Sequence, residues 1–358
     1  MDTFAYLAQM SEKLGPSGHE VETSAWYREL FTPLCDEVKV DALFNVIAYK
    51  KHTAPLPEGV TAPRVMLCAH QDEIGLLVTD ILPDGTLRLG SIGGVDPRIL
   101  PGSRVTVYPT GDRGKKLPAI VGYRPAQMQT EDERSRNYQR DELWADTGLS
   151  LEEVKAMVHI GDLVALYGPA TKLLNDYAAS KTMDDRACIG CLLQAAERLQ
   201  TLQCKCDVYF VCTTQEEIGS KGAAVSAWGI HPDLAIALDV SHATIPASRA
   251  DTTVPVDAPA LTCGPYIQHK LLARALRVAK EHGIAVNTEL SPMYTSTDAD
   301  DVILCREGIP CLLIDLPLKY MHTTVETLSM QALRECGRLL AEFLHDLDEG
   351  WADDLWME

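Results

Sequence analysis

The hydrophobic and polar positions along the chain change their spacing several times, and each change predicts a different element. Apolar residues recur at helical spacing over 2–13 and 20–31, which predicts two helices separated by a Gly- and Pro-containing turn at 15–18. Residues 38–49 and 65–69 are rich in β-branched and apolar side chains and predict strands. The second of these is a continuous apolar run, which suits a sheet covered on both faces.

In the second quarter of the chain the strand-like segments become short and alternate with Asp-Gly, Gly-Gly and Pro-Gly turns. This pattern is typical of a small β-rich unit. Residues 74–164 are therefore expected to form a β-rich domain inserted into a larger domain that comprises 1–73 and 165–358. Within the insertion, residues 127–140 are polar and charged, and we expect an exposed loop there.

After the insertion, strand-like and helix-like segments alternate to the end of the chain. The expected helices are 186–202, one starting at 220, 266–282, 299–306 and one starting at 329, and the expected strands are 208–213, 234–238 and 311–314. Such alternation favours an α/β sandwich.

The composition is that of a folded globular protein, with 46% apolar and 23% charged residues among 358. Asp and Glu number 51 and Lys and Arg 32, so the net charge is −19, which repels nucleic-acid phosphates and anionic lipid surfaces. No apolar run reaches the ~20 residues that span a bilayer, and the N-terminus does not resemble a secretory signal. Eleven cysteines in such a chain favour reduced thiols over disulfides. We therefore expect a cytoplasmic protein with neither nucleic-acid nor membrane partners.

Acidic and imidazole side chains follow several of the predicted strands. They are His70 with Asp72, Asp184 with Asp185, Glu216 with Glu217, Asp239, and His322. Binding crevices of open α/β sheets form at the carboxyl ends of strands, so we expect these groups to converge. Few basic residues are near them in sequence, and an unpaired buried charge is costly, so divalent cations are the expected partners. Imidazoles combined with carboxylates suit zinc, cobalt or manganese better than calcium, although the spacing does not fix the number of ions.

Five segments containing these residues resemble the ordered motifs of a known family. They are His70–Gly75 (HQDEIG), Lys181–Arg186 (KTMDDR), Thr214–Gly219 (TQEEIG), Asp239 and Tyr320–Glu326 (YMHTTVE). In order and spacing, and in the β-rich segment after the first motif, the chain is similar to the di-metal glutamyl and deblocking aminopeptidases along nearly its whole length. This family is also known as the tetrahedral or endoglucanase M-like aminopeptidases.

The resemblance implies a three-layer sandwich with a mixed central sheet and a small inserted β-barrel-like domain. The inserted domain would mediate dimerisation, and the dimers would form a tetrahedral dodecamer. The resemblance also implies two divalent cations per subunit, with zinc expected first and cobalt or manganese as alternatives. The implied ligands are His70, Asp184, Glu217, Asp239 and His322, with Asp184 bridging the two ions. Asp72 would orient His70, and the peptide bond after Asp184 would be cis.

The implied reaction is hydrolysis of the N-terminal residue from short peptides by a water molecule shared between the two cations. Glu216 is our candidate general base, because neighbouring residues of an extended segment point in opposite directions and Glu217 would bind metal. The alternative for Glu216 is a simple cap of the following helix.

Substrate recognition is less well marked in the sequence. The free α-amine needs carboxylate partners, for which the candidates are Glu73, Asp185 and Asp298. Thr297 and Asp298 belong to a stretch that resembles the family's Gly-Thr-Asp-Ala sequence near the specificity pocket, with Ser296 in place of the glycine. An acidic substrate would need a basic pocket residue, for which Lys319 and Arg249 are the candidates.

Three alternatives remain at this stage. A glycoside hydrolase would need two carboxylates and neither histidine ligands nor metal. A catalytically silent assembly or metal-binding homologue would keep the scaffold without the activity. Cys188-x-x-Cys191, followed by Cys204-x-Cys206, could form a structural zinc site or a redox pair, but the apolar helical setting of the first pair favours simple packing of the thiols.

Overall fold

An eight-stranded mixed sheet forms the centre of the larger part of the molecule in the computed structural model, which describes residues 1–249, 251–348, 350–351 and 355. Across the sheet the strands are β1 (Glu37–Val40), β2 (Val46–Lys50), β12 (Asp207–Thr213), β3 (Arg64–His70), β13 (Leu234–His242), β16 (Cys311–Leu318), β14 (Ala260–Cys263) and β15 (Asn287–Leu290). β12, β3, β13 and β16 run parallel to one another. They are almost entirely buried, as expected for apolar strands that are covered on both faces.

Helices cover both faces of this sheet and complete a three-layer sandwich. One layer is α1 (Thr3–Glu12), α2 (Val21–Phe31), α5 (Met183–Arg198), α7 (His269–Glu281) and α9 (Met330–Asp346), and the other is α6 (Lys221–Ile230) and α8 (Asp298–Val302). The expected starts of α6 and α9 are confirmed, with Ser329 accepting a hydrogen bond from Ala332 N at the N-cap of α9. Cys188 and Cys191 lie fully buried within α5, consistent with packing of the thiols.

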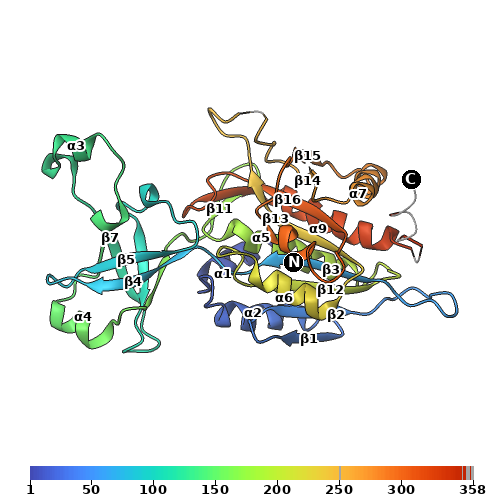
Figure 1. The fold of residues 1–358 in the computed structure, drawn as a ribbon, viewed down its shortest axis with the longest axis horizontal. Coiled ribbons are helices and arrows are strands. Elements are labelled where there is room, and N and C mark those ends of the chain that lie inside the picture. Colours follow the sequence, from blue (N-terminus) through green and yellow to red (C-terminus); the bar gives the residue numbers. More distant parts are fainter. Residues whose placement is uncertain (250, 349, 352–354, 356–358) are drawn as a thin grey trace.

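A closed six-stranded barrel projects from one side of the sandwich (Figure 1). Its strands in order are β4 (Gly75–Ile81), β5 (Leu87–Ile92), β8 (Trp144–Asp146), β7 (Leu117–Gly122), β6 (Arg104–Tyr108) and β9 (Leu163–Leu166). The barrel has an apolar core of its own, separate from that of the sandwich. It also carries α4 (Leu151–Met157). The chain enters the barrel immediately after the motif that follows β3.

Three smaller elements complete the fold. β10 (Thr171–Lys172), β11 (Tyr177–Ser180) and β17 (Glu326–Ser329) form a separate antiparallel sheet.

None of the described helices is long and apolar enough to cross a bilayer.

The expected helix 299–306 is only the short α8, and β14 and β15 were not expected. Two further differences from the sequence prediction have a clear local cause. Residues 38–49 form two antiparallel strands instead of one, because the Asp41 carboxylate accepts hydrogen bonds from Leu43 N and Asn45 N and turns the chain between them. The exposed segment 127–140 is not wholly irregular, because it contains the short helix α3 (Glu131–Arg134). Thr130 and Glu133 form a capping box at the start of that helix.

Candidate metal centre

Three parallel strands bring candidate ligands to one edge of the central sheet. β3 ends at His70. On one side of β3, β12 leads into the turn that carries Glu216 and Glu217, and on the other side of β3, β13 carries Asp239. Because the carboxyl ends of parallel strands lie at the same side of the sheet, residues that are far apart in sequence come together here.

The remaining two candidate ligands come from outside the sheet. Asp184 lies at the start of α5, where the Asp184–Asp185 peptide bond is cis, as the family resemblance implies. His322 lies in the loop between β16 and β17 and has a left-handed backbone, with φ of 60°.

Asp184 lies between the two imidazoles. Its Oδ1 is 3.0 Å from His70 Nε2, and its Oδ2 is 3.1 Å from His322 Nε2. Glu217 Oε1 lies 3.3 Å from the same His322 nitrogen. One carboxylate thus faces a histidine on each side.

The described residues contain two sets of three potential ligands whose atoms lie within 4.8 Å of one another. The sets are His70, Asp184 and Glu217, and His70, Asp185 and Asp239. All five implied ligands therefore take part in the cluster, His322 through its contacts with Asp184 and Glu217. Asp185 joins it beside Asp239, and its Oδ2 accepts a hydrogen bond of 3.3 Å from His70 N.

The electrostatics of the cluster indicate that it is built for added positive charge. Although burial opposes a charged imidazole, contacts with Asp184 and Glu217 raise the pKa of His322 to about 11. Burial also opposes the charge on His70, but hydrogen bonds with Asp184 and Asp72 raise its pKa well above the usual range. Burial raises the pKa of Asp239 well above its ordinary value. The cluster of carboxylates thus favours positive charge among its members.

The donor atoms fit divalent cations. Asp185 Oδ1 is one of the buried side-chain oxygens without a hydrogen-bond partner, and the contact of Glu217 Oε1 is the 3.3 Å ion pair with His322 Nε2. Buried carboxylate oxygens without donors are costly unless a cation contacts them. Two imidazole nitrogens and several carboxylates are a set that zinc, cobalt or manganese accepts.

Surrounding groups hold the candidate ligands in place. The Asp72 carboxylate accepts hydrogen bonds from Ser17 Oγ and from the backbone N–H groups of Glu216 and Glu217. Its Oδ1 lies 3.6 Å from His70 Nδ1. Asp72 therefore connects the segment His70–Gly75 to the turn that carries Glu216 and Glu217, in addition to its contact with His70.

His322 is positioned by two residues that the sequence analysis left without a role. Gly94, in the barrel, accepts a hydrogen bond of 3.1 Å from His322 Nδ1, which leaves Nε2 directed at Asp184. A Cβ at Gly94 would lie 2.9 Å from that ring nitrogen, so only glycine permits the approach. Glu326 accepts hydrogen bonds from the backbone N–H groups of His322 and Asp184 and so couples the two ligands.

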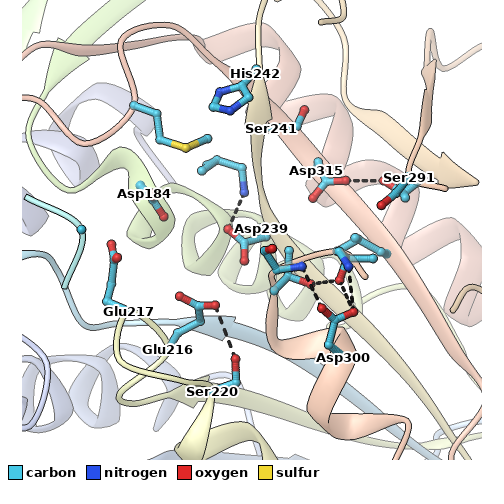
Figure 2. A pocket seen from close by; sticks show the side chains of 18 of the residues that line it. Asp184, Glu216, Glu217, Ser220, Asp239, Ser241, His242, Ser291, Asp300 and Asp315 are labelled. Atoms are coloured by element: carbon cyan, nitrogen blue, oxygen red, sulfur yellow. Dashed lines mark hydrogen bonds between the residues drawn. The ribbon is translucent and has the colours of Figure 1, made fainter. Parts of the chain in front are cut away.

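Glu216 is close to the candidate ligands without being part of either set. Its Oε2 lies 3.9 Å from His70 Nε2, and its Oε1 accepts a weak hydrogen bond of 3.4 Å from Ser220. Burial raises the pKa of Glu216 to about 8. The carboxylates of Glu216 and of the candidate ligand Glu217 both line the same cavity (Figure 2).

A cavity of about 570 Å³ opens from the cluster and continues between the sheet, α8 and the loop before α8. Thr297 lines it, whereas Asp298 is buried behind it, with Oδ2 accepting a hydrogen bond from Thr213. Ser296, which replaces the family's glycine, also lines the cavity and keeps a left-handed backbone with φ of 59°.

Other candidates for substrate recognition have different roles in the structure. Glu73 is paired with Lys181 and Arg186. Arg249 forms an exposed ion pair with Asp251, and Lys319 lies over the Tyr177 ring. Neither of these two candidate pocket cations lines the cavity.

Comparison with known proteins agrees with this arrangement. Residues 46–339 match the M42 glutamyl aminopeptidase family. The lysyl aminopeptidase of Pyrococcus furiosus is 32% identical over 346 residues, which cover 95% of this chain and 96% of that relative.

Two solved structures share the fold. The TET aminopeptidase of a marine sediment Thaumarchaeota archaeon has a TM-score of 0.91 and 27% identity, with 99% of this chain and 100% of that chain covered. The Pyrococcus horikoshii TET1 peptidase, which can assemble into a tetrahedron or a large octahedral shell, has a TM-score of 0.81 and 27% identity, with 97% and 100% covered. The expected fold class is confirmed, and the chain belongs to the M42 glutamyl aminopeptidase family of peptidases.

Proposed function

We propose that this protein is a metal-dependent aminopeptidase that removes N-terminal residues from short peptides with the help of two divalent cations. The proposed ligands are His70, Asp184, Glu217, Asp239 and His322. The observation that carries this proposal is the position of Asp184, whose two oxygens lie 3.0 and 3.1 Å from the nitrogens of His70 and His322. Zinc is the expected metal, with cobalt or manganese as alternatives.

When bound, the two cations would polarise the scissile carbonyl and lower the pKa of a water molecule. Glu216 would accept a proton from that water and then donate it to the leaving amine. Its position supports this role, because its carboxylate faces the cluster and belongs to neither ligand set. Asp72 would hold Glu216, Glu217 and His70 in fixed positions relative to one another through the contacts described above.

The proposal extends to domain organisation and assembly. Residues 1–73 with 165–358 would form the catalytic domain, and residues 74–164 would mediate dimerisation. The fold shared with the assembling TET1 peptidase supports a homo-oligomer, with dimers building a tetrahedral dodecamer. All eleven cysteines are free thiols, which supports a reducing location such as the cytoplasm.

The test is peptide hydrolysis by the full-length protein before and after dialysis against a chelator. We expect release of amino acids from the N-terminus of short peptides, loss of this activity on chelation, and recovery with zinc, cobalt or manganese. Matched peptides with an acetylated N-terminus should not be cleaved. Internal cleavage, or hydrolysis of soluble cellulose that resists the chelator, would contradict the proposal.

Glu216→Gln provides the sharper test of mechanism. We expect kcat to fall by about 10²- to 10⁴-fold with bound metal unchanged, because the carboxamide cannot accept the proton. Glu29→Gln on the exposed face of α2 is the matched control and should behave as the wild type. Unchanged activity of Glu216→Gln would remove Glu216 from the mechanism, whereas loss of metal would make it a ligand.

A further inference from the structure

The cavity extends away from the candidate metal centre along a row of polar side chains on one face of the sheet. Asp239 on β13 is paired in register with Asp315 on the neighbouring parallel strand β16. On β14, Ala260 lies opposite Asp315, so Thr262 two residues later faces the same side of the sheet. Thr262 in turn lies opposite Glu289 on β15. All of these side chains except that of Ala260 line the cavity.

Asp315 and Glu289 are two further carboxylates of this row. Asp315 is 3% exposed, and one of its oxygens accepts a hydrogen bond from Thr262. Glu289 Oε2 is buried and has no hydrogen-bond partner among the described residues. Figure 2 shows Asp315 on the far side of Asp239 from Glu216 and Glu217. Because neighbouring strands lie about 5 Å apart, the row leads outward from the centre in steps that a long side chain can span.

Other groups of the cavity wall do not neutralise these carboxylates. No Lys or Arg is among the described residues that line the cavity. Asp300 is committed to the adjacent loop, where it accepts hydrogen bonds from Thr295 N and Ser296 N. His242 also lines the cavity and lies close enough to Glu289 to lower the pKa of that carboxyl, although burial outweighs this effect.

A further metal ion does not fit this end of the cavity. The two sets of potential metal ligands among the described residues include neither Asp315 nor Glu289. Leu313 and Met321 also line the cavity and give its wall apolar surface. Apolar walls with carboxylates beyond them suit a long aliphatic stem that ends in a cation.

We propose that this part of the cavity binds the side chain of the N-terminal residue and selects lysine or arginine, with Asp315 and Glu289 as the specificity-determining residues. The inference rests on the proposed function, because it takes the adjacent cluster to be the catalytic centre. It replaces the expectation of a basic pocket for acidic substrates, since Lys319 and Arg249 lie outside the cavity.

The physical reason is charge compensation. Burial first and the neighbouring Glu289 second raise the pKa of Asp315 to about 8, and burial raises the pKa of Glu289. A substrate ammonium or guanidinium would supply the missing positive charge and allow both carboxylates to ionise. An acidic side chain would be repelled, and an apolar one would leave the carboxylates without a partner.

The test compares aminoacyl p-nitroanilides of lysine, arginine, leucine and glutamate with the metal-loaded wild-type protein. We expect kcat/KM for lysine or arginine to exceed that for leucine and glutamate by about 30-fold or more, the size expected for a desolvated charge pair. As a measurement independent of any variant, lysinamide should inhibit more strongly than norleucinamide, which has the same chain without the ammonium.

Two nearly isosteric variants assign the effect to the two carboxylates. Asp315→Asn and Glu289→Gln should each lower the ratio of lysine to leucine kcat/KM by about tenfold or more. Their bound zinc and their far-UV circular dichroism spectra should match those of the wild type, which shows that they fold and retain metal. Asp80→Asn and Glu29→Gln, both exposed, are the matched controls and should keep the wild-type ratio.

Failure of this inference differs from failure of the proposed function. Metal-dependent activity that favours leucine or glutamate, or variants that keep the lysine preference, would overturn the assignment of Asp315 and Glu289 alone. Absence of hydrolysis with every substrate and metal would overturn the proposed function, and this inference with it.

Discussion

The two ends of the cavity use the same residue type with different partners. At the metal end, Asp184 lies between His70 and His322, so carboxylates alternate with imidazoles at hydrogen-bond distance. At the other end, Asp315 and Glu289 are accompanied by hydroxyl and apolar groups and by His242, and no described lysine or arginine lines the wall. Imidazole next to carboxylate makes a compact donor set for a divalent ion, whereas spaced carboxylates beside apolar walls suit an organic cation. The groups that surround a buried carboxylate therefore determine whether it suits a metal ion or an organic cation.

The largest effect is expected from a substitution at the metal end of the cavity. Asp184→Asn removes the negative charge that faces both imidazoles, and the variant should lose bound metal and at least about four orders of magnitude of activity, since carbonyl polarisation and water activation are lost together. Metal analysis after dialysis, together with an aminoacyl anilide assay, measures both effects. Asp80→Asn is the matched control. Retention of metal and activity by Asp184→Asn would show that Asp184 does not bridge the ions.

A smaller effect is expected where the metal end is supported from outside. Asp72→Asn should lower metal affinity or activity by about 10- to 100-fold, because its carboxylate organises the backbone of Glu216 and Glu217 and lies next to His70. Ser17→Ala, which removes one donor to Asp72, should have a weaker effect in the same direction. Titration of the metal-free protein with zinc measures the affinity. If Asp72→Asn binds zinc and turns over substrate as the wild type does, the supporting role is wrong.

The metal end could be predicted from sequence because its signals are local. His70 and Asp239 each come after an apolar run, so a buried ionisable group was evident without knowledge of the fold. The contribution of Gly94 could not be predicted, since the barrel brings it to His322 across 228 residues of sequence. Glu326 lay inside a recognised motif, but its contacts with the backbones of two ligands depend on the β16–β17 loop and the start of α5.

The pocket end was missed for a different reason. Asp315 follows the apolar run 311–314 in the same way that Asp239 follows 235–238, so the argument that identified Asp239 applied equally to it. Glu289 gave no such signal, because β15 is a short edge strand with only partly buried and exposed residues. Pairing of β15 with β14 and of β14 with β16 sets Glu289 beside the row that Asp315 begins. Such pairing between distant short strands is not encoded in local periodicity.

The smallest expected effect is a change of substrate preference with pH. Burial and Glu289 raise the pKa of Asp315 to about 8, so below that pH the empty pocket holds a proton that a bound lysine side chain must displace. The lysine ammonium stays charged throughout, since its pKa is about 10.4. The ratio of lysine to leucine kcat/KM should therefore rise several-fold from pH 6 to pH 8.5.

Taking this ratio cancels proton effects at the metal end, which act on both substrates alike, and leaves those of the pocket. Asp315→Asn should flatten the rise, because the asparagine side chain has no proton to lose, while Glu289 remains able to titrate. A wild-type ratio that does not change with pH would mean that the pocket carboxylates are already ionised without substrate. Cations of the protein or solvent would then have to compensate them, and the pocket end would differ from the metal end in geometry but not in charge.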